Sequence, residues 1–93
     1  MAKEIEESKL KRYFEITKKA LEKASKAVSK KHEKEAMQIL DMALRYYKDA
    51  QWFEKRGDFV NAFAAINYAH GWLDAGSKLG IFKVKDSKLF VIK

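Results

Sequence analysis

The amino-acid sequence predicts an all-α protein, an up-and-down bundle of three helices. The 93 residues include no proline and only four glycines, so long helices are allowed almost everywhere. Apolar residues recur every three or four positions through three long stretches, which is the period of one helix face. A glycine and an aspartate at 57–58 indicate a connection so short that the flanking helices must be antiparallel neighbours.

The first helix is expected over about residues 3–29. Its apolar stripe advances in steps of four and three residues, which places the stripe on one face. Three Glu–Lys pairs four residues apart, each with the acid first, support the helix locally. The segment 29–32 is the expected break before the next helix. The stripe consists of Leu10, Phe14, Thr17, Leu21, Ala24 and Val28.

The second helix is expected over about residues 33–56, with a broad apolar face. Gly57 suits the left-handed position that follows a helix end. Asp58 can accept hydrogen bonds from the unpaired N–H groups at the start of the next helix. The turn therefore ends one helix and begins another.

The third helix, about residues 59–79, is the most apolar of the three. Its polar stripe is thin, so apolar residues cover most of its circumference, and Leu79 widens the apolar side. A helix of this kind is expected to lie between other helices or against a partner. Gly76 is expected to let a neighbouring helix approach closely, and Gly80 to end the helix.

Residues 81–93 differ in character from the helices. Two apolar residues alternate with lysines at the start, a turn-like segment follows at 85–88, and 89–92 favours a strand. We expect a short β-hairpin packed on the bundle, because an isolated hairpin is only marginally stable. The predicted organisation is one bundle over residues 1–80 followed by this tail.

Length and composition argue against several classes of function. A domain of this size buries only roughly 60% of the surface of its unfolded chain, so a deep substrate cavity is not expected in a monomer. The sequence has no cysteine, no glycine-rich phosphate loop and no serine in a nucleophile elbow. We therefore expect no enzymatic activity, no small-molecule cofactor and no metal. Because no signal peptide or apolar run of 18 residues is found, we expect a cytoplasmic protein without membrane contact.

The net charge of +7 is concentrated at the two ends of the chain. Residues 1–35 and 76–93 each carry a net charge of +4, whereas the segment between them carries −1. One interpretation is contact with a polyanion such as nucleic acid, through electrostatics and without base specificity. The other is the Lys/Glu-rich surface that is typical of thermophilic proteins. The candidate polyanion contacts are Lys30, Lys31, Lys34, Lys83, Lys85 and Lys88.

The segment 67–76, NYAHGWLDAG, holds a candidate binding surface. Asn67, His70 and Asp74 share nearly one helix face, and Gly71 lies among them. A single imidazole with one carboxylate and one amide is a poor metal site, and a histidine bonded to its helical neighbour is the simpler interpretation. Alanine would suit the position of Gly71 better by roughly 1 kcal/mol. We therefore expect a docked partner or ligand at these four residues.

Aromatic residues are concentrated in the middle of the chain. Eight of the 12 lie between residues 46 and 72, more than a three-helix core easily buries. Tyrosine and tryptophan at a surface are typical interface anchors, although partial burial with polar tips in water is the alternative. The candidate interface residues are Tyr46, Trp52 and Tyr68.

A longer pattern runs through the second and third predicted helices. It reads Tyr47-x-x-Ala50…Phe53-x-x-x-Gly57-Asp58-x-x-x-Ala62-Phe63-Ala64-Ala65-x-Asn67-Tyr68-Ala69-His70-Gly71-Trp72-Leu73-Asp74-Ala75-Gly76. This pattern resembles an uncharacterised archaeal family that is catalogued as domain of unknown function 357. The resemblance implies an archaeal, spectrin-repeat-like three-helix bundle with no known activity. It does not extend to the predicted hairpin.

A looser similarity links the chain to the helical HEPN domains, which include ribonucleases and partners of nucleotidyltransferases. Their ribonuclease signature is an arginine followed a few residues later by a histidine. Here Arg56 and His70 are 14 residues apart, so ribonuclease activity is not expected.

Three functions remain open from the sequence. The first is a protein-interaction module that self-associates or docks on another protein through its aromatic surface. The second is a weak, non-specific nucleic-acid binder that uses the lysine-rich ends. The third, a helper subunit of a nucleotide-handling enzyme, rests on the HEPN-like similarity alone.

Overall fold

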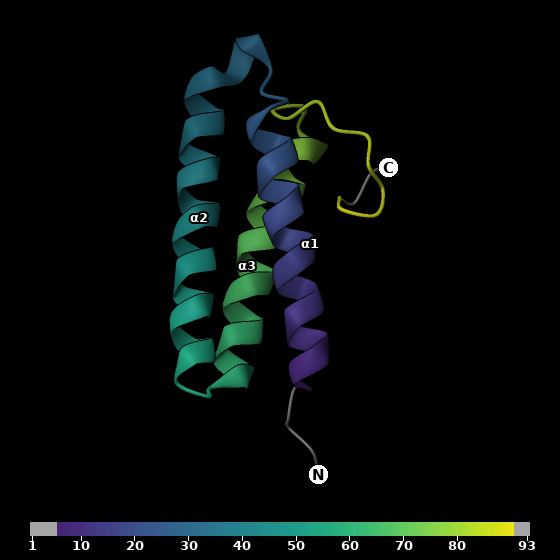
Figure 1. Ribbon diagram of the computed structural model, residues 1–93. Coiled ribbons are helices and arrows are strands. Elements are labelled where there is room, and N and C mark those ends of the chain that lie inside the picture. Colours follow the sequence, from purple (N-terminus) through teal and green to yellow (C-terminus); the bar gives the residue numbers. More distant parts are fainter. Residues whose placement is uncertain (1–5, 91–93) are drawn as a thin grey trace.

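The computed structural model describes residues 6–90 and shows the predicted three-helix bundle (Figure 1). The helices are α1 (Glu7–Ser25), α2 (Glu33–Lys55) and α3 (Phe59–Lys78), and a 3-10 helix, η1 (Lys30–His32), precedes α2. The three α-helices run up, down and up, and the chain after α3 folds back beside α1. In this part of the chain no helix combines the length and apolarity needed to cross a membrane.

The core consists of two clusters of buried side chains. One joins Leu10 and Phe14 of α1 to residues near the α2–α3 turn, including Ala50, Ala62 and Ile66. The other lies at the opposite end of the bundle and includes residues from all three helices and from the segment after α3. α3 packs extensively against both α2 and α1, which contact each other far less, so α3 makes most of the helix–helix contacts in the bundle.

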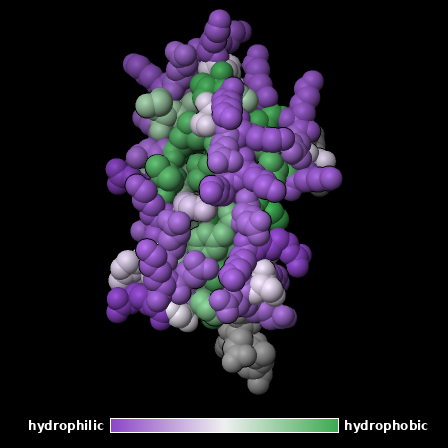
Figure 2. All heavy atoms as spheres, viewed as in Figure 1, coloured by the Kyte–Doolittle hydropathy of each residue, from purple (hydrophilic) through white to green (hydrophobic). Residues whose placement is uncertain are grey.

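Polar and charged side chains cover the outer side of the bundle that α1 and α2 present. Figure 2 shows this face, on which hydrophilic residues predominate and apolar residues are visible mainly between them.

Tyr47 of α2 lies half-buried between the helices, edge-on to Phe14 of α1, and burial raises the pKa of its hydroxyl. Its hydroxyl therefore stays protonated in the folded protein beyond its ordinary range.

The turn between α2 and α3 forms as the sequence predicts. Gly57 has a φ angle of +77°, a backbone conformation that glycine adopts without steric cost. The Asp58 carboxylate accepts a hydrogen bond of 3.2 Å from the backbone N–H of Asn61, so it caps α3. Together they fix α2 and α3 as antiparallel neighbours.

The first helix is shorter than predicted at its C-terminal end. α1 ends at Ser25 rather than near residue 29, because the following residues leave the helix to bond the segment after α3. Ser29 N–H donates to the carbonyl of Ile81 at 2.9 Å, and Lys83 N–H donates to the carbonyl of Ala27 at 2.7 Å. The predicted start at residues 3–5 lies outside the described residues.

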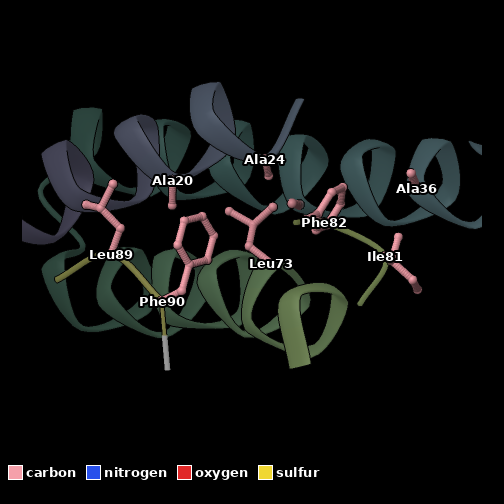
Figure 3. Close-up of a cluster of buried hydrophobic side chains, with 9 residues drawn as sticks. Ala20, Ala24, Ala36, Leu73, Ile81, Phe82, Leu89 and Phe90 are labelled. Atoms are coloured by element: carbon pink, nitrogen blue, oxygen red, sulfur yellow. The ribbon is translucent and has the colours of Figure 1, made fainter. Parts of the chain in front are cut away.

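The segment 81–90, called the tail below, does not form the predicted hairpin. Its described residues contain one isolated antiparallel bridge, between Phe82 and Val28, and a turn at 87–89. The predicted strand continues into 91–92, outside the described residues. Figure 3 shows side chains of the tail projecting between α1 and α3, toward Ala20, Ala24 and Leu73. The buried tail residues are Ile81, Phe82, Leu89 and Phe90.

Gly76 lets the tail, not a neighbouring helix, approach α3. A Cβ atom at this position would lie only 2.6 Å from Cδ2 of Phe82 and even closer to Cε2 of the same ring. Phe82 is only 1% exposed, so its ring has little room to move away. The expectation of a close approach at Gly76 is confirmed, but the expected neighbour was wrong.

Candidate functional site

His70 connects three parts of the fold. Its Nδ1 lies 3.1 Å from the hydroxyl of Thr17 in α1, and its Nε2 lies 2.5 Å from the backbone carbonyl of Leu89 in the tail. A carbonyl oxygen only accepts hydrogen bonds, so Nε2 must carry the proton. In the neutral ring, Nδ1 then accepts from the Thr17 hydroxyl. Asp74 lies one turn further along α3, with its Oδ1 3.6 Å from Nε2. Nε2 therefore holds the tail, and Nδ1 holds α1, against α3.

The four residues predicted as a binding surface line a single hollow of about 340 Å³. α1 supplies Tyr13 and Ile16 to its wall, and the tail supplies the segment 87–90. Apart from its chain neighbours and the backbone of its own helix, no atom lies within 4 Å of where a Cβ of Gly71 would be, so the hollow is open at that point. The hollow is lined by an amide, a carboxylate and an imidazole, and the imidazole makes contacts with α1 and the tail. The four predicted residues are Asn67, His70, Gly71 and Asp74.

Around this hollow, the described residues do not provide the further side chains that a metal ion would need. Within residues 6–90, no group of three or more His, Cys, Asp or Glu side chains is arranged to hold a metal ion.

The structure brings together two of the three predicted interface aromatics. The rings of Tyr46 and Tyr68 meet edge to face, with centroids 4.4 Å apart, and Tyr68 also lies beside Trp72. Trp52 lies elsewhere, near the end of α2, where the guanidinium of Arg56 stacks over its ring at 4.5 Å. Tyr68 and Trp52 are 54% and 55% exposed, whereas Tyr46 is half-buried. Tyr46 and Tyr68 therefore belong to one surface, and Trp52 to another.

That surface extends along the whole solvent-facing side of α3. Six exposed apolar or small residues follow one another at intervals of four, four, three, four and four, so they share one helix face. Lys78 is the single charged side chain among the exposed residues of α3, a helix that the structure describes in full. We call this surface the α3 outer face. It consists of Val60, Ala64, Tyr68, Gly71, Ala75 and Leu79.

Sequence reasoning missed most of the α3 outer face. Leu79 was expected on the apolar side that packs in the bundle, but it is 69% exposed. The signal was present in the apolar circumference of residues 59–79, although it could not say which apolar positions face outward. An apolar hollow of about 310 Å³ lies on this face. It is lined by Tyr68, Gly71, Trp72 and Ala75.

The six predicted polyanion contacts do not gather in one place. Lys30, Lys31 and Lys83 meet in a hollow of about 550 Å³ at the α1–α2 connection, together with His32. No acidic side chain is among the described residues that line it. Lys88 instead lines the two hollows beside α1. Lys34 and Lys85 are exposed and line none of these hollows. Half of the predicted set thus forms a basic hollow.

Another hollow, of about 620 Å³, lies between α1 and the tail. Basic and acidic side chains alternate around it, and Lys23 bridges it to Asp86 in the tail with a salt bridge of 2.8 Å. A groove lined by both kinds of charge and bridged by an ion pair is more typical of a solvated surface than of a binding site for one ligand.

A comparison with known protein families finds a match that covers most of the bundle. A family model described as "Protein of unknown function (DUF357)" matches residues 12–82. The chain belongs to this family. The DUF357 match includes α2 and α3 in full, Gly76 and its neighbour Phe82, and every residue of the α3 outer face. Neither a curated protein nor a solved structure matches the chain.

Proposed function

We propose that this DUF357 chain is a non-enzymatic protein-interaction module whose contact surface is the α3 outer face. The supporting observation is an uninterrupted apolar face on a protein in which 35% of residues are charged. Contiguous exposed apolar surface on a soluble domain is typical of interaction sites.

The composition of the face fits this role. Val60, Tyr68 and Leu79 are all at least half exposed, and covering each one stabilises a complex by roughly 1 kcal/mol. Tyr68 is also the kind of residue that anchors interfaces, because its ring is large and loses little conformational freedom on burial. Ala64 and Ala75 are exposed and small, so another helix can approach the backbone of α3 between the larger side chains.

Ala64→Glu tests the proposed contact surface, because it introduces a charge at an exposed helical position without disturbing the core. Met37→Glu is the matched control, since Met37 is 70% exposed on α2 and lies outside the face. We expect Ala64→Glu to weaken association strongly, measured both for the chain alone and by capture from an extract of the native organism. The control should behave like the wild type. Association that is absent, or that is equal in all three proteins, would contradict the proposal.

A second function, polyanion binding, is favoured by the basic hollow at the α1–α2 connection. Lys30, Lys31 and Lys83 converge there from segments about 50 residues apart in the sequence, with no lining acid to neutralise them. Three lysines so placed favour a phosphate backbone, and the lack of arginine argues for contact without base readout.

The test is a fluorescence-polarisation titration of single-stranded RNA at several salt concentrations. Replacing Lys30, Lys31 and Lys83 with glutamine should weaken binding and lower the slope of log K against log salt by about 2. The control replaces three exposed lysines elsewhere, Lys11, Lys18 and Lys48, which changes the net charge equally. Equal losses in both variants, or no wild-type binding at low salt, would exclude the hollow as a specific site.

A further inference from the structure

We infer that the partner of the α3 outer face is a second copy of this chain, packed antiparallel across a two-fold axis. This inference rests on the proposed function and names its partner. It follows from three properties of the face: the order of its side chains, their shapes and the partial charges at its ends.

The order of side chains along the face is self-complementary. In an antiparallel pair related by a two-fold axis, each residue faces the one at the same distance on the other side of the midpoint. Val60 and Leu79 have their midpoint between Ala69 and His70. The pairs Ala64–Ala75 and Tyr68–Gly71 share that same midpoint. One register therefore pairs Val60 with Leu79 at the ends, Ala64 with Ala75 further in, and Tyr68 with Gly71 at the centre.

The shapes at the centre also complement one another. Tyr68 projects from the surface, and in this register it faces Gly71 of the second copy. Apart from its chain neighbours and local helix backbone, nothing lies within 4 Å of where a Gly71 Cβ would be, and the apolar hollow of about 310 Å³ lies beside this glycine. Each Tyr68 can thus enter the hollow of the other copy, as a knob enters a hole between packed helices. This arrangement also accounts for a glycine in the middle of an exposed helix face.

The partial charges at the ends of α3 favour the same antiparallel arrangement. Lys78 and Asn61 lie about 100° apart around the helix axis, so they fall at opposite edges of the face and do not meet in this register. Antiparallel packing sets the positive N-terminal end of each α3 against the negative C-terminal end of the other. This arrangement of dipoles offsets part of the repulsion between two chains that each carry a net charge of +7.

Sedimentation equilibrium of the full chain tests the inference, with the Ala64→Glu and Met37→Glu variants beside the wild type. We expect the wild type and Met37→Glu to approach twice the monomer mass of 10.8 kDa at high concentration. Ala64→Glu should weaken the association by at least ~10-fold, because it places a charge opposite Ala75 at a buried contact. Circular dichroism checks that all three remain folded.

Cysteine cross-linking tests the register directly, because the natural chain has no cysteine. An antiparallel pair should form a disulfide when Ala64→Cys and Ala75→Cys chains are mixed and oxidised. Neither variant should cross-link alone, since two Ala64 positions would lie roughly 16 Å apart along the helix axis, beyond disulfide reach. Cross-linking of Ala64→Cys with itself, or no preference for the mixture, would overturn the register.

A monomeric wild type would overturn the second copy as partner. If such a monomer still captured another protein in a manner sensitive to Ala64→Glu, the proposed interaction function would survive with a different partner. A monomer with no such capture would overturn both.

Discussion

Gly76 and Gly71 lie on the same helix but serve opposite purposes. Gly76 is buried, and its missing side chain leaves the space that the ring of Phe82 fills. Gly71 is exposed, and nothing occupies the space beside it. The first glycine is therefore required for the fold of one chain, whereas the second is available for contact with another.

Alanine substitutions should separate these two roles. Gly76→Ala forces the Phe82 ring out of place, an overpacking that typically costs about 1–3 kcal/mol and outweighs the gain in helix propensity. Gly71→Ala should instead raise the free energy of unfolding by about 0.5–1 kcal/mol, because alanine favours a helix interior. Urea unfolding at low protein concentration, where self-association is negligible, measures both changes. Equal effects at the two positions would contradict these assignments.

The sequence predicts which residues share a helix face better than it predicts which distant residues they contact. The sequence indicates that Asn67, His70, Gly71 and Asp74 share a helix face, because helical spacing alone determines that, and they do line one hollow. It gives no sign that His70 contacts Thr17 and Leu89, since those contacts join residues 53 and 19 positions away. Sequence patterning sees neighbours within a helix and not those brought together by folding.

At the scale of elements, the tail shows the clearest difference between expectation and structure. Alternating Phe82 and Val84 favour a strand, but a strand needs a continuous partner, and residues 26–29 provide only one bridge. The buried apolar side chains instead occur as two adjacent pairs, 81–82 and 89–90, which bend into the bundle at each end of the tail. Burial of these pairs outweighs a local β preference that is weak in any case. The same docking shortens α1, an outcome that no residue near position 26 predicts.

A salt bridge at the bend of the tail makes its docking sensitive to acid. Lys23 donates to Asp86 at 2.8 Å and the N–H of Lys88 donates to the same carboxylate at 3.0 Å. These bonds, with that from Lys23 the stronger, hold the pKa of Asp86 below its ordinary value of 3.8. A lowered pKa in the folded state means that the carboxylate stabilises the fold above pH 3.8, and that this contribution is lost as pH falls through the lowered pKa.

Asp86→Asn tests this contribution, since asparagine keeps a hydrogen-bond acceptor for Lys88 but lacks the charge. The wild type should melt at a slightly higher temperature than the variant at neutral pH. The difference should be small, because the pair is exposed and screened by salt. It should close as pH falls below 3.8, the ordinary pKa. A difference in melting temperature that persists unchanged into strong acid would show that the charge of Asp86 is not its source.

For the whole molecule, the sequence predicts the bundle well and its exposed surface poorly. The helix bounds of α2 and α3, their short turn and the cap at Asp58 all follow from local signals, and local signals suffice for antiparallel helices. Which apolar residues of α3 face outward depends on the relative rotation of three helices. Leu73 is fully buried and Leu79 is mostly exposed, although both are leucines on the same helical segment. Only the assembled bundle distinguishes them.

The exposed surface gives the molecule two faces of different chemistry. Hydrophilic side chains predominate on the side that α1 and α2 present (Figure 2), although Met37, Leu44 and Trp52 of α2 are exposed. α3 presents an apolar face that no part of the described chain covers. The basic hollow lies at the end of the bundle where α1 joins α2, so one chain has room for contacts at both surfaces. The central claim is that the α3 outer face is the surface through which this DUF357 chain associates.

The most direct measurement is a dilution series of two-dimensional amide NMR spectra, from millimolar to micromolar protein. The account predicts concentration-dependent shifts that are confined to α3 and largest for the amides of Ala64, Tyr68, Gly71 and Ala75. The amide signals of Lys30 and Lys31 at the basic hollow should not shift over the same range, whereas Leu79, which lines that hollow, belongs to the α3 outer face. Spectra that do not change on dilution, or changes centred outside α3, would contradict self-association through this face.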